Sequence, residues 1–153
     1  MVLMQNLPEA SQKNLSNLEC PTFEAKPWVT GKPLSARRVA MISSSGIHLR
    51  DDKRFAGGES GYREIPDGTP AEDIIMSHVS VNYDRTGYQQ DINTIFPLDR
   101  MKELAADGTI GSVAKVHYSF MGATDPRKME DEARALAQRL KSDDVDSAIL
   151  LPV

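Results

Sequence analysis

The pattern of hydrophobic and polar positions predicts strands that alternate with amphipathic helices. Short apolar runs typical of strands occupy residues 37–43, 74–80 and 147–151, and residues 110–120 predict a turn followed by a strand. Apolar residues recur with helical spacing in residues 98–107, which begin after Pro97 and stop at Asp107-Gly108, and in residues 126–142. Strands linked by helices pair in parallel through crossovers. We therefore expect a small, mostly parallel α/β sheet with helical crossovers, an incomplete doubly wound domain of the flavodoxin or Rossmann-like kind.

The chain divides into an N-terminal extension and one α/β domain. Residues 1–36 contain four prolines and no clear period apart from a short helix at about 9–18, so we expect an extension that wraps on the domain with Trp28 as its anchor. The domain covers residues 37–153, and its polar, glycine-rich stretch 49–70 predicts a long loop. The four apolar residues 148–151 predict a parallel strand that is covered on both faces.

Composition narrows the class of protein. The 153 residues carry a formal net charge of −4 without a basic stripe, which argues against a nucleic-acid partner. No apolar run approaches the roughly 20 residues of a membrane span, and the apolar N-terminus lacks the positive charge of a signal peptide. We therefore expect a cytoplasmic protein without a membrane partner. The single cysteine, Cys20, agrees with a reducing compartment.

Side chains that can carry chemistry follow the predicted strands. They are Ser43, Ser44, Ser45, Gly46 and His48 after the first strand, His78, Ser80 and Asn82 after the second, and His117, Ser119 and Gly122 at the third. The carboxyl ends of parallel strands meet at one edge of a sheet, which is where α/β proteins bind ligands. We therefore expect these groups to converge on one site.

The residues alone leave two interpretations of this edge open. In one, a histidine takes part in catalysis. In the other, the backbone amides of Ser43-Ser-Ser-Gly46 hold a small anionic ligand in a non-catalytic α/β module. The phosphate-binding glycine patterns and the Gly-x-Ser-x-Gly context of a hydrolase serine are both absent from the sequence. Three histidines can bind zinc, but their spacing matches no metal site, so we expect no metal.

Three stretches of the chain carry a family resemblance. They are residues 79–87, 91–104 and 108–122, with Asp-x-Asn-x-x-Phe-Pro-x-Asp-Arg starting at Asp91 and His-Tyr-Ser-Phe-Met-Gly starting at His117 as the specific motifs. In this order and spacing they resemble the selenoprotein B subunits of glycine, sarcosine and betaine reductases and their relative in D-proline reductase. The likeness extends over residues 37–153. It implies a selenol- or thiol-dependent oxidoreductase that reductively cleaves a C–N bond of an amino acid or a derivative.

The resemblance also implies where the redox nucleophile belongs. In that family, a strand similar to residues 144–153 leads into a motif that begins with selenocysteine or cysteine. The nucleophile is therefore expected just after Val153, in a domain that continues beyond residue 153. Because selenocysteine is encoded by UGA, we expect the chain to be the amino-terminal part of a selenoprotein ended at an in-frame UGA and inactive alone. The alternative is a domain that ends on its last strand.

Roles for individual residues follow from the resemblance as expectations. His78, His117 and Ser119 would support catalysis, since a nearby imidazolium lowers the pKa of a thiol or selenol. Contacts with the substrate are expected from Ser44, Ser45, His48, Asn82, Asp91 and Asn93. We expect no cofactor in this chain and a pyruvoyl group on a partner subunit. The expected partners are other subunits of a reductase complex, a thiol or thioredoxin-type electron donor and a small-molecule substrate.

Overall fold

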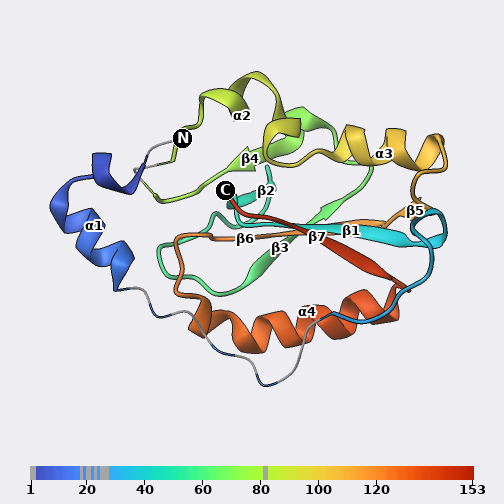
Figure 1. Ribbon diagram of the computed structural model, residues 1–153. Coiled ribbons are helices and arrows are strands. Elements are labelled where there is room, and N and C mark those ends of the chain that lie inside the picture. Colours follow the sequence, from blue (N-terminus) through green and yellow to red (C-terminus); the bar gives the residue numbers. More distant parts are fainter. Residues whose placement is uncertain (1–2, 18, 20–21, 23, 25–27, 81–82) are drawn as a thin grey trace.

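The protein is an α/β structure built on one mixed sheet (Figure 1). The computed structural model describes residues 3–17, 19, 22, 24, 28–80 and 83–153. Its strands are β1 (Arg38–Ser43), β2 (Ile47–Leu49), β3 (Tyr62–Pro66), β4 (Ile74–Met76), β5 (Ser112–Val113), β6 (Val116–Phe120) and β7 (Ser147–Leu151). Its α-helices are α1 (Glu9–Ser16), α2 (Thr86–Gln90), α3 (Leu98–Ala106) and α4 (Glu130–Ser142), and its 3-10 turns are η1 (Met4–Asn6), η2 (Leu34–Ala36), η3 (Ala71–Asp73), η4 (Ile92–Thr94) and η5 (Pro126–Met129). Helices α3 and α4 cover opposite faces of the sheet.

Strand β1 is the centre of the sheet. It pairs in parallel with β7 on one side, from Val39↔Ser147 to Ser43↔Leu151, and with β5 and then β6 on the other. Strand β3 pairs antiparallel with β6, and β2 and β4 form a separate antiparallel pair. The predicted α/β class is confirmed. The sheet is mixed, so the mostly parallel, doubly wound arrangement is not confirmed.

Strand β3 lies inside the stretch that the sequence predicts as a loop. Of its five residues only Ile65 is fully buried, so the strand lacks the apolar run by which a covered strand is detected. It can end at Pro66 because it lies at the border of the five-stranded sheet, where its free side needs no further ladder hydrogen bond. An antiparallel strand of this kind is therefore missed by a search for apolar runs.

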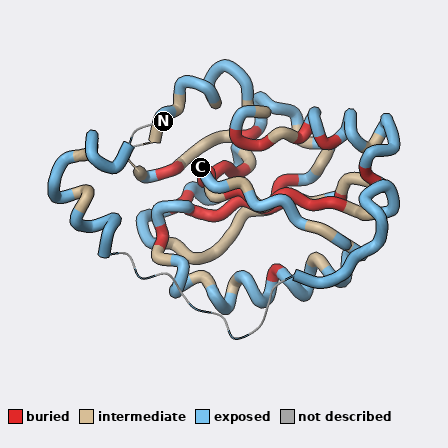
Figure 2. Tube along the Cα trace, in the orientation of Figure 1, coloured by how far each residue is buried: buried red, intermediate tan, exposed pale blue. Residues whose placement is uncertain are grey.

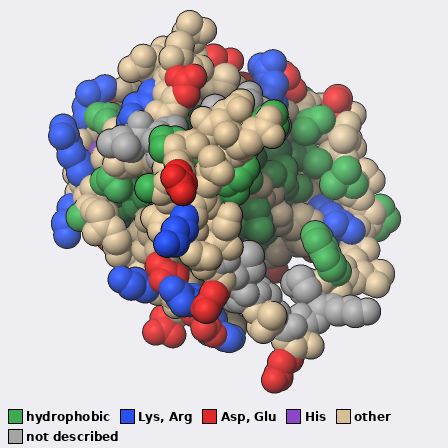
Figure 3. All heavy atoms as spheres, turned by 60° about the vertical axis from the view of Figure 1, so that its left-hand side comes forward, with side chains coloured by type: hydrophobic (Ala, Val, Ile, Leu, Met, Phe, Trp, Pro, Cys, Tyr) green, Lys and Arg blue, Asp and Glu red, His purple; other side chains and the backbone are tan. Residues whose placement is uncertain are grey.

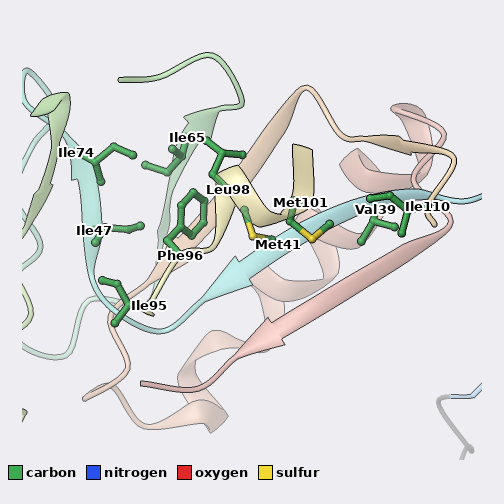
Figure 4. Packing of buried hydrophobic residues seen from close by; sticks show 10 residues of the cluster. All are labelled: Val39, Met41, Ile47, Ile65, Ile74, Ile95, Phe96, Leu98, Met101 and Ile110. Atoms are coloured by element: carbon green, nitrogen blue, oxygen red, sulfur yellow. The ribbon is translucent and has the colours of Figure 1, made fainter. Parts of the chain in front are cut away.

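The core forms two layers because side chains alternate between the faces of each strand. On the α3 face, Val39 and Met41 of β1 pack with Phe96 and Met101 (Figure 4). On the α4 face, Leu136 packs with apolar side chains of β6. Figure 2 shows the consequence: β1 is buried along most of its length, whereas β7 is largely exposed.

Two predictions about coverage are wrong. Trp28 is 89% exposed, so it anchors nothing, and α1 buries no residue. Strand β7 lies where the sequence predicts it and pairs in parallel, but it is not covered on both faces: Ile149 is 39% and Leu150 70% exposed. The reason is that β7 is an edge strand, and among the described residues no strand pairs with its outer side.

The packing of α4 gives a direct test of the fold. Leu136 is 2% exposed between α4 and β6, so Leu136→Ala leaves a cavity and should lower the free energy of unfolding by about 2–4 kcal/mol. Leu104→Ala on α3, where the side chain is 36% exposed, is the matched control and should cost about 1 kcal/mol or less. Urea denaturation measures both. Equal losses for the two variants would contradict the packing of α4 on the sheet.

Candidate functional site

The loop after β1 is held by its own backbone amides. Ser44 N–H donates to Leu151 O (3.0 Å), Ser45 N–H to Ser43 Oγ (3.2 Å), Gly46 N–H to Phe120 O (2.9 Å) and Ile47 N–H to Ser119 Oγ (2.9 Å). Each donor therefore has a partner within the protein, and none is left for a ligand. The expected anion cradle at Ser43-Ser-Ser-Gly46 is not supported, because the fold itself uses its amides.

Ser44 joins the carboxyl ends of three strands. Its hydroxyl oxygen accepts a hydrogen bond from Val153 N–H at 2.9 Å, just past the end of β7. Its carbonyl accepts another from Gly122 N–H at 2.9 Å, just past β6. A Cβ at Gly122 would lie 2.5 Å from this carbonyl oxygen, so only glycine allows the contact. Ser44 was predicted to bind substrate, and here its side chain holds the end of the chain.

An apolar cavity of about 510 Å³ lies next to this junction, between the sheet and the start of α4. Its lining comes from β1, the end of β6, η5, α4 and β7, and includes Ile42, Phe120, Met129, Ala133, Leu150 and Pro152. Figure 3 shows this side of the molecule, where hydrophobic side chains gather around a hollow. Ser44 also lines the cavity, so the junction and the cavity form one continuous surface.

His117 lies inside the sheet and is fully buried. Its Nδ1 accepts a hydrogen bond from Met41 N–H at 3.0 Å, which places the proton of the neutral ring on Nε2. Burial lowers the pKa of His117 to about 4; the Asp67 carboxylate opposes the shift and the Lys102 ammonium adds to it. The ring is therefore neutral at pH 7. This environment favours a structural His117 over the imidazolium that the sequence predicts beside a selenol or thiol.

His78 is the histidine packed against the loop after β1. Gly46 has a φ of +66°, and a Cβ there would lie 3.1 Å from the Cα of His78, so the two backbones are in close contact. Nδ1 of His78 accepts from Ser80 N–H at 3.1 Å, and Nε2 has no hydrogen-bond partner among the described residues. Burial, with a smaller contribution from the Arg85 charge, lowers the pKa of His78. The neutral ring of His78 therefore carries its proton on the buried Nε2, from which it can donate a hydrogen bond.

The remaining predicted residues of the edge are occupied by local hydrogen bonds. Ser45 Oγ accepts from Ser43 Oγ at 2.8 Å, and Ser119 Oγ accepts from the loop at Ile47. His48 Nδ1 donates to Leu49 O at 2.6 Å. The side chains of Ser43, Ser45, His48 and Ser119 are all buried. These side chains hold the loop in place and do not point into an open site. Asn82, which was also predicted to contact the substrate, lies outside the described residues.

Asp91 and Asn93 form a cap that starts η4 and α3. Asp91 Oδ1 accepts from the backbone and the side-chain amide of Asn93, both at 2.9 Å. The Asn93 amide also donates to Asp99 Oδ2 at 2.9 Å, and its oxygen accepts from Asp99 N–H at 3.1 Å. These bonds satisfy donors that a helix start leaves free. The Asp-x-Asn-x-x-Phe-Pro-x-Asp motif thus has a structural explanation, and the predicted contact of both residues with substrate stays a prediction.

The three histidines lie on different elements of the structure. His117 lies within β6, His48 in β2 and His78 past β4. Within residues 3–17, 19, 22, 24, 28–80 and 83–153, no group of three or more His, Cys, Asp or Glu side chains could hold a metal ion. In the same part of the chain no helix has the length and hydropathy to cross a membrane.

Comparison with known proteins indicates the class of protein to which the chain is related. The chain is similar to components of amino acid reductases: it is 34% identical over 139 residues to D-proline reductase subunit gamma of Acetoanaerobium sticklandii, which covers 88% of this chain. It is 30% identical over 139 residues to glycine reductase complex component B subunit gamma of Symbiobacterium thermophilum, covering 85% of the chain. It is 29% identical over 138 residues to sarcosine reductase complex component B subunit beta of Peptoclostridium acidaminophilum, again covering 85%.

The family model described as glycine/sarcosine/betaine reductase selenoprotein B matches residues 3–152. The chain belongs to this family, as the motifs starting at Asp91 and His117 predict. The match spans 57% of D-proline reductase subunit gamma and about a third, 32% and 31%, of the glycine and sarcosine reductase subunits. No solved structure matches the chain significantly.

The protonation of His117 gives a test of the site. The unfolded chain takes up this proton near pH 6.5 and the folded protein only near pH 4, so the unfolded state binds more protons between these values. His117 should therefore make the free energy of unfolding fall as pH is lowered from 6.5 to 4, by at most about 1.4 kcal/mol per pH unit.

Urea denaturation at several pH values measures this slope. His117→Asn retains an acceptor for Met41 N–H but does not titrate, so the extra slope should disappear in that variant. NMR of the ring nitrogens should show the Nε2–H tautomer at pH 6. A ring that titrates near pH 6.5 in the folded protein would contradict the assignment.

Proposed function

We propose that this chain is the scaffold of a selenol- or thiol-dependent amino acid reductase, in which its sheet edge positions the redox nucleophile. Membership of the selenoprotein B family supports the class of reaction, the reductive cleavage of a C–N bond in an amino acid or a derivative. The names of the relatives make glycine, sarcosine, betaine and D-proline the candidate substrates. The anion-binding alternative lacks support, since the loop after β1 has no free amide.

The single observation that carries the proposal is the hydrogen bond from Val153 N–H to Ser44 Oγ. It fixes the end of β7 at the loop after β1, so a residue attached to Val153 emerges at the carboxyl edge of the sheet beside the apolar cavity. This is the edge at which α/β proteins place their chemistry. The proposal thus puts the nucleophile one residue beyond the Ser44 contact.

The reaction needs two reducing groups and two protons. When present, the residue after Val153 supplies a selenolate or thiolate that displaces the protonated amine from carbon. A second thiol then attacks the selenium or sulfur and releases the carbon fragment, which takes up a proton. The pair of groups is thereby oxidised to a selenosulfide or disulfide while the C–N bond is reduced. A dithiol or thioredoxin-type donor restores the reduced pair.

Two side chains of this chain have roles in that step. The Ser44 hydroxyl accepts from Val153, and its own proton has no acceptor among the described residues, so it can donate to a selenolate, a thiolate or a substrate carbonyl. His78 packs against Gly46, two residues from Ser44, and its neutral ring can donate a hydrogen bond to the substrate from the buried, unpartnered Nε2–H. His117 and Ser119 act indirectly, by holding β1 and the loop after it.

The proposal includes partners because the relatives are components of reductase complexes. We assign to this chain a place beside other subunits of such a complex, in the cytoplasm. The pyruvoyl group that the resemblance implies belongs to a partner subunit, and the roles of Ser44 and His78 do not require it.

Reconstitution tests the proposed function. The gene is first read past Val153, and the protein is produced with cysteine at the next position and with the downstream frame, together with the partner subunits of a D-proline or glycine reductase complex. Dithiol-dependent cleavage of one of the four candidate substrates is expected, while the 153-residue chain with the same partners gives none. Lack of activity toward all four, or equal activity from the 153-residue chain, would reject the proposal.

Ser44→Ala in the active protein tests the positioning role, and Ser147→Ala is the matched control. Ser147 lies at the opposite end of β7, where its hydroxyl accepts from Arg37 at 3.1 Å. Because misplacement of a nucleophile by about 1 Å can cost 100-fold, Ser44→Ala should lower kcat about 10- to 100-fold with little change in KM. Ser147→Ala should leave kcat within about twofold of the unmodified protein, since it lies away from the reacting atoms.

A further inference from the structure

We infer that the outer side of β7 and the adjoining apolar cavity form a docking surface for a helix and a parallel strand translated directly after Val153. The helix fills the cavity beside α4, and the strand pairs with the free edge of β7. The inference rests on the proposed function, because it requires the chain to pass through the nucleophile position. It goes further by assigning a surface and the kind of segment that occupies it.

The free edge of β7 has none of the features that protect an exposed strand. Among the described residues β7 pairs with β1 alone, so the amides and carbonyls of its outer side face outward. Its sequence, Ser-Ala-Ile-Leu-Leu, contains no charge and no proline, the two devices that usually keep edge strands from pairing. Leu150 is 70% and Ile149 39% exposed, one on each face of the sheet. An edge of this kind is suited to lie inside a larger sheet.

The topology decides which face the next helix covers. The chain runs from β6 through α4 to β7, crossing over β1 in a parallel connection. Parallel crossovers in one sheet are right-handed in about 98% of cases. A further crossover that continues past β7 in the same direction therefore places its helix on the α4 face. Leu150 and the apolar cavity lie on that face.

The cavity has the character of a helix-packing surface. It measures about 510 Å³, and Ile42, Met129, Leu150 and Pro152 are among its apolar lining residues. No charged side chain lines it, which fits the apolar stripe of an amphipathic helix better than the charged groups of a free amino acid. Pro152 and Val153 leave β7 at the cavity, so a segment attached to them reaches it without a long loop.

The length of the relatives favours a segment of the same polypeptide over a second copy of the chain. The match spans 57% of D-proline reductase subunit gamma, so that subunit has further polypeptide outside the matched part. Pairing of β7 with β7 of a second copy would cover the strand edge but bring no helix to the cavity. The attached segment covers both, and as part of the same chain it has a high effective concentration.

Alkylation of a thiol introduced with Leu150→Cys tests the docking. It is measured in a Cys20→Ser background, in the 153-residue chain and in the protein extended through its reading frame, with serine in place of the nucleophile and of any downstream cysteine. Reaction with a maleimide should be at least about tenfold slower in the extended protein, since docking buries position 150. Leu104→Cys on α3 is the control, and its rate should be the same in both proteins.

Several results would overturn the docking inference. They are equal rates at position 150 in the two proteins, a downstream frame that encodes no helix and strand, and a 153-residue chain that forms a dimer which Leu150→Asp disrupts. The last result would assign the surface to a second copy. Protection at position 150 together with an inactive reconstituted enzyme would reject the proposed function and keep the docking. Activity of the reconstituted enzyme with an unprotected position 150 would keep the proposed function and reject the docking.

Discussion

The parallel pairing of β1 with β7 is the constraint on which the rest of the structure depends. Five consecutive residue pairs fix its register, from Val39↔Ser147 to Ser43↔Leu151. A slip by one residue would turn every side chain of β7 to the opposite face, so Leu151 would leave the core and Leu150 would enter it. Only the observed register places Val153 N–H opposite the Ser44 hydroxyl. The position of the chain end at the sheet edge is therefore a direct consequence of strand pairing.

Most polar groups near this edge form hydrogen bonds within the protein that stabilise the fold, so they are not free to bind a ligand. Ser43, Ser45 and Ser119 bond the loop after β1, and His117 accepts from the backbone of β1. Buried polar groups are costly unless they are bonded, so each of these side chains specifies the arrangement of its neighbours. Among the described residues, the Ser44 hydroxyl proton and Nε2 of His78 are two of the groups near this loop that have no hydrogen-bond partner. In the proposed enzyme, the residue after Val153 therefore carries the redox chemistry, and this chain positions it.

The sequence predicts elements that carry a strong local pattern and misses those that do not. Helix α3 follows from the spacing of its apolar residues and its boundary signals, and β1 and β7 follow from their apolar runs. Strand β3 is missed because only Ile65 is fully buried in it. The exposure of β7 is also missed, since an apolar run does not reveal whether a covering element is present. At the site, the pairing of Ser44 with Val153 joins residues that are 109 positions apart, so no local pattern indicates it.

Amide hydrogen exchange at Val153 tests the central claim most directly, because it reports the one contact that fixes the end of β7. In the 153-residue chain we expect this amide to exchange at least about tenfold more slowly than in an unstructured peptide. Ser44→Ala should remove that protection and leave unchanged the exchange of Ala114 N–H, which donates to Val39 O on the other side of β1. Exchange of Val153 at the rate of an unstructured peptide in the unmodified chain, with Ala114 protected, would contradict the positioning of the chain end by Ser44.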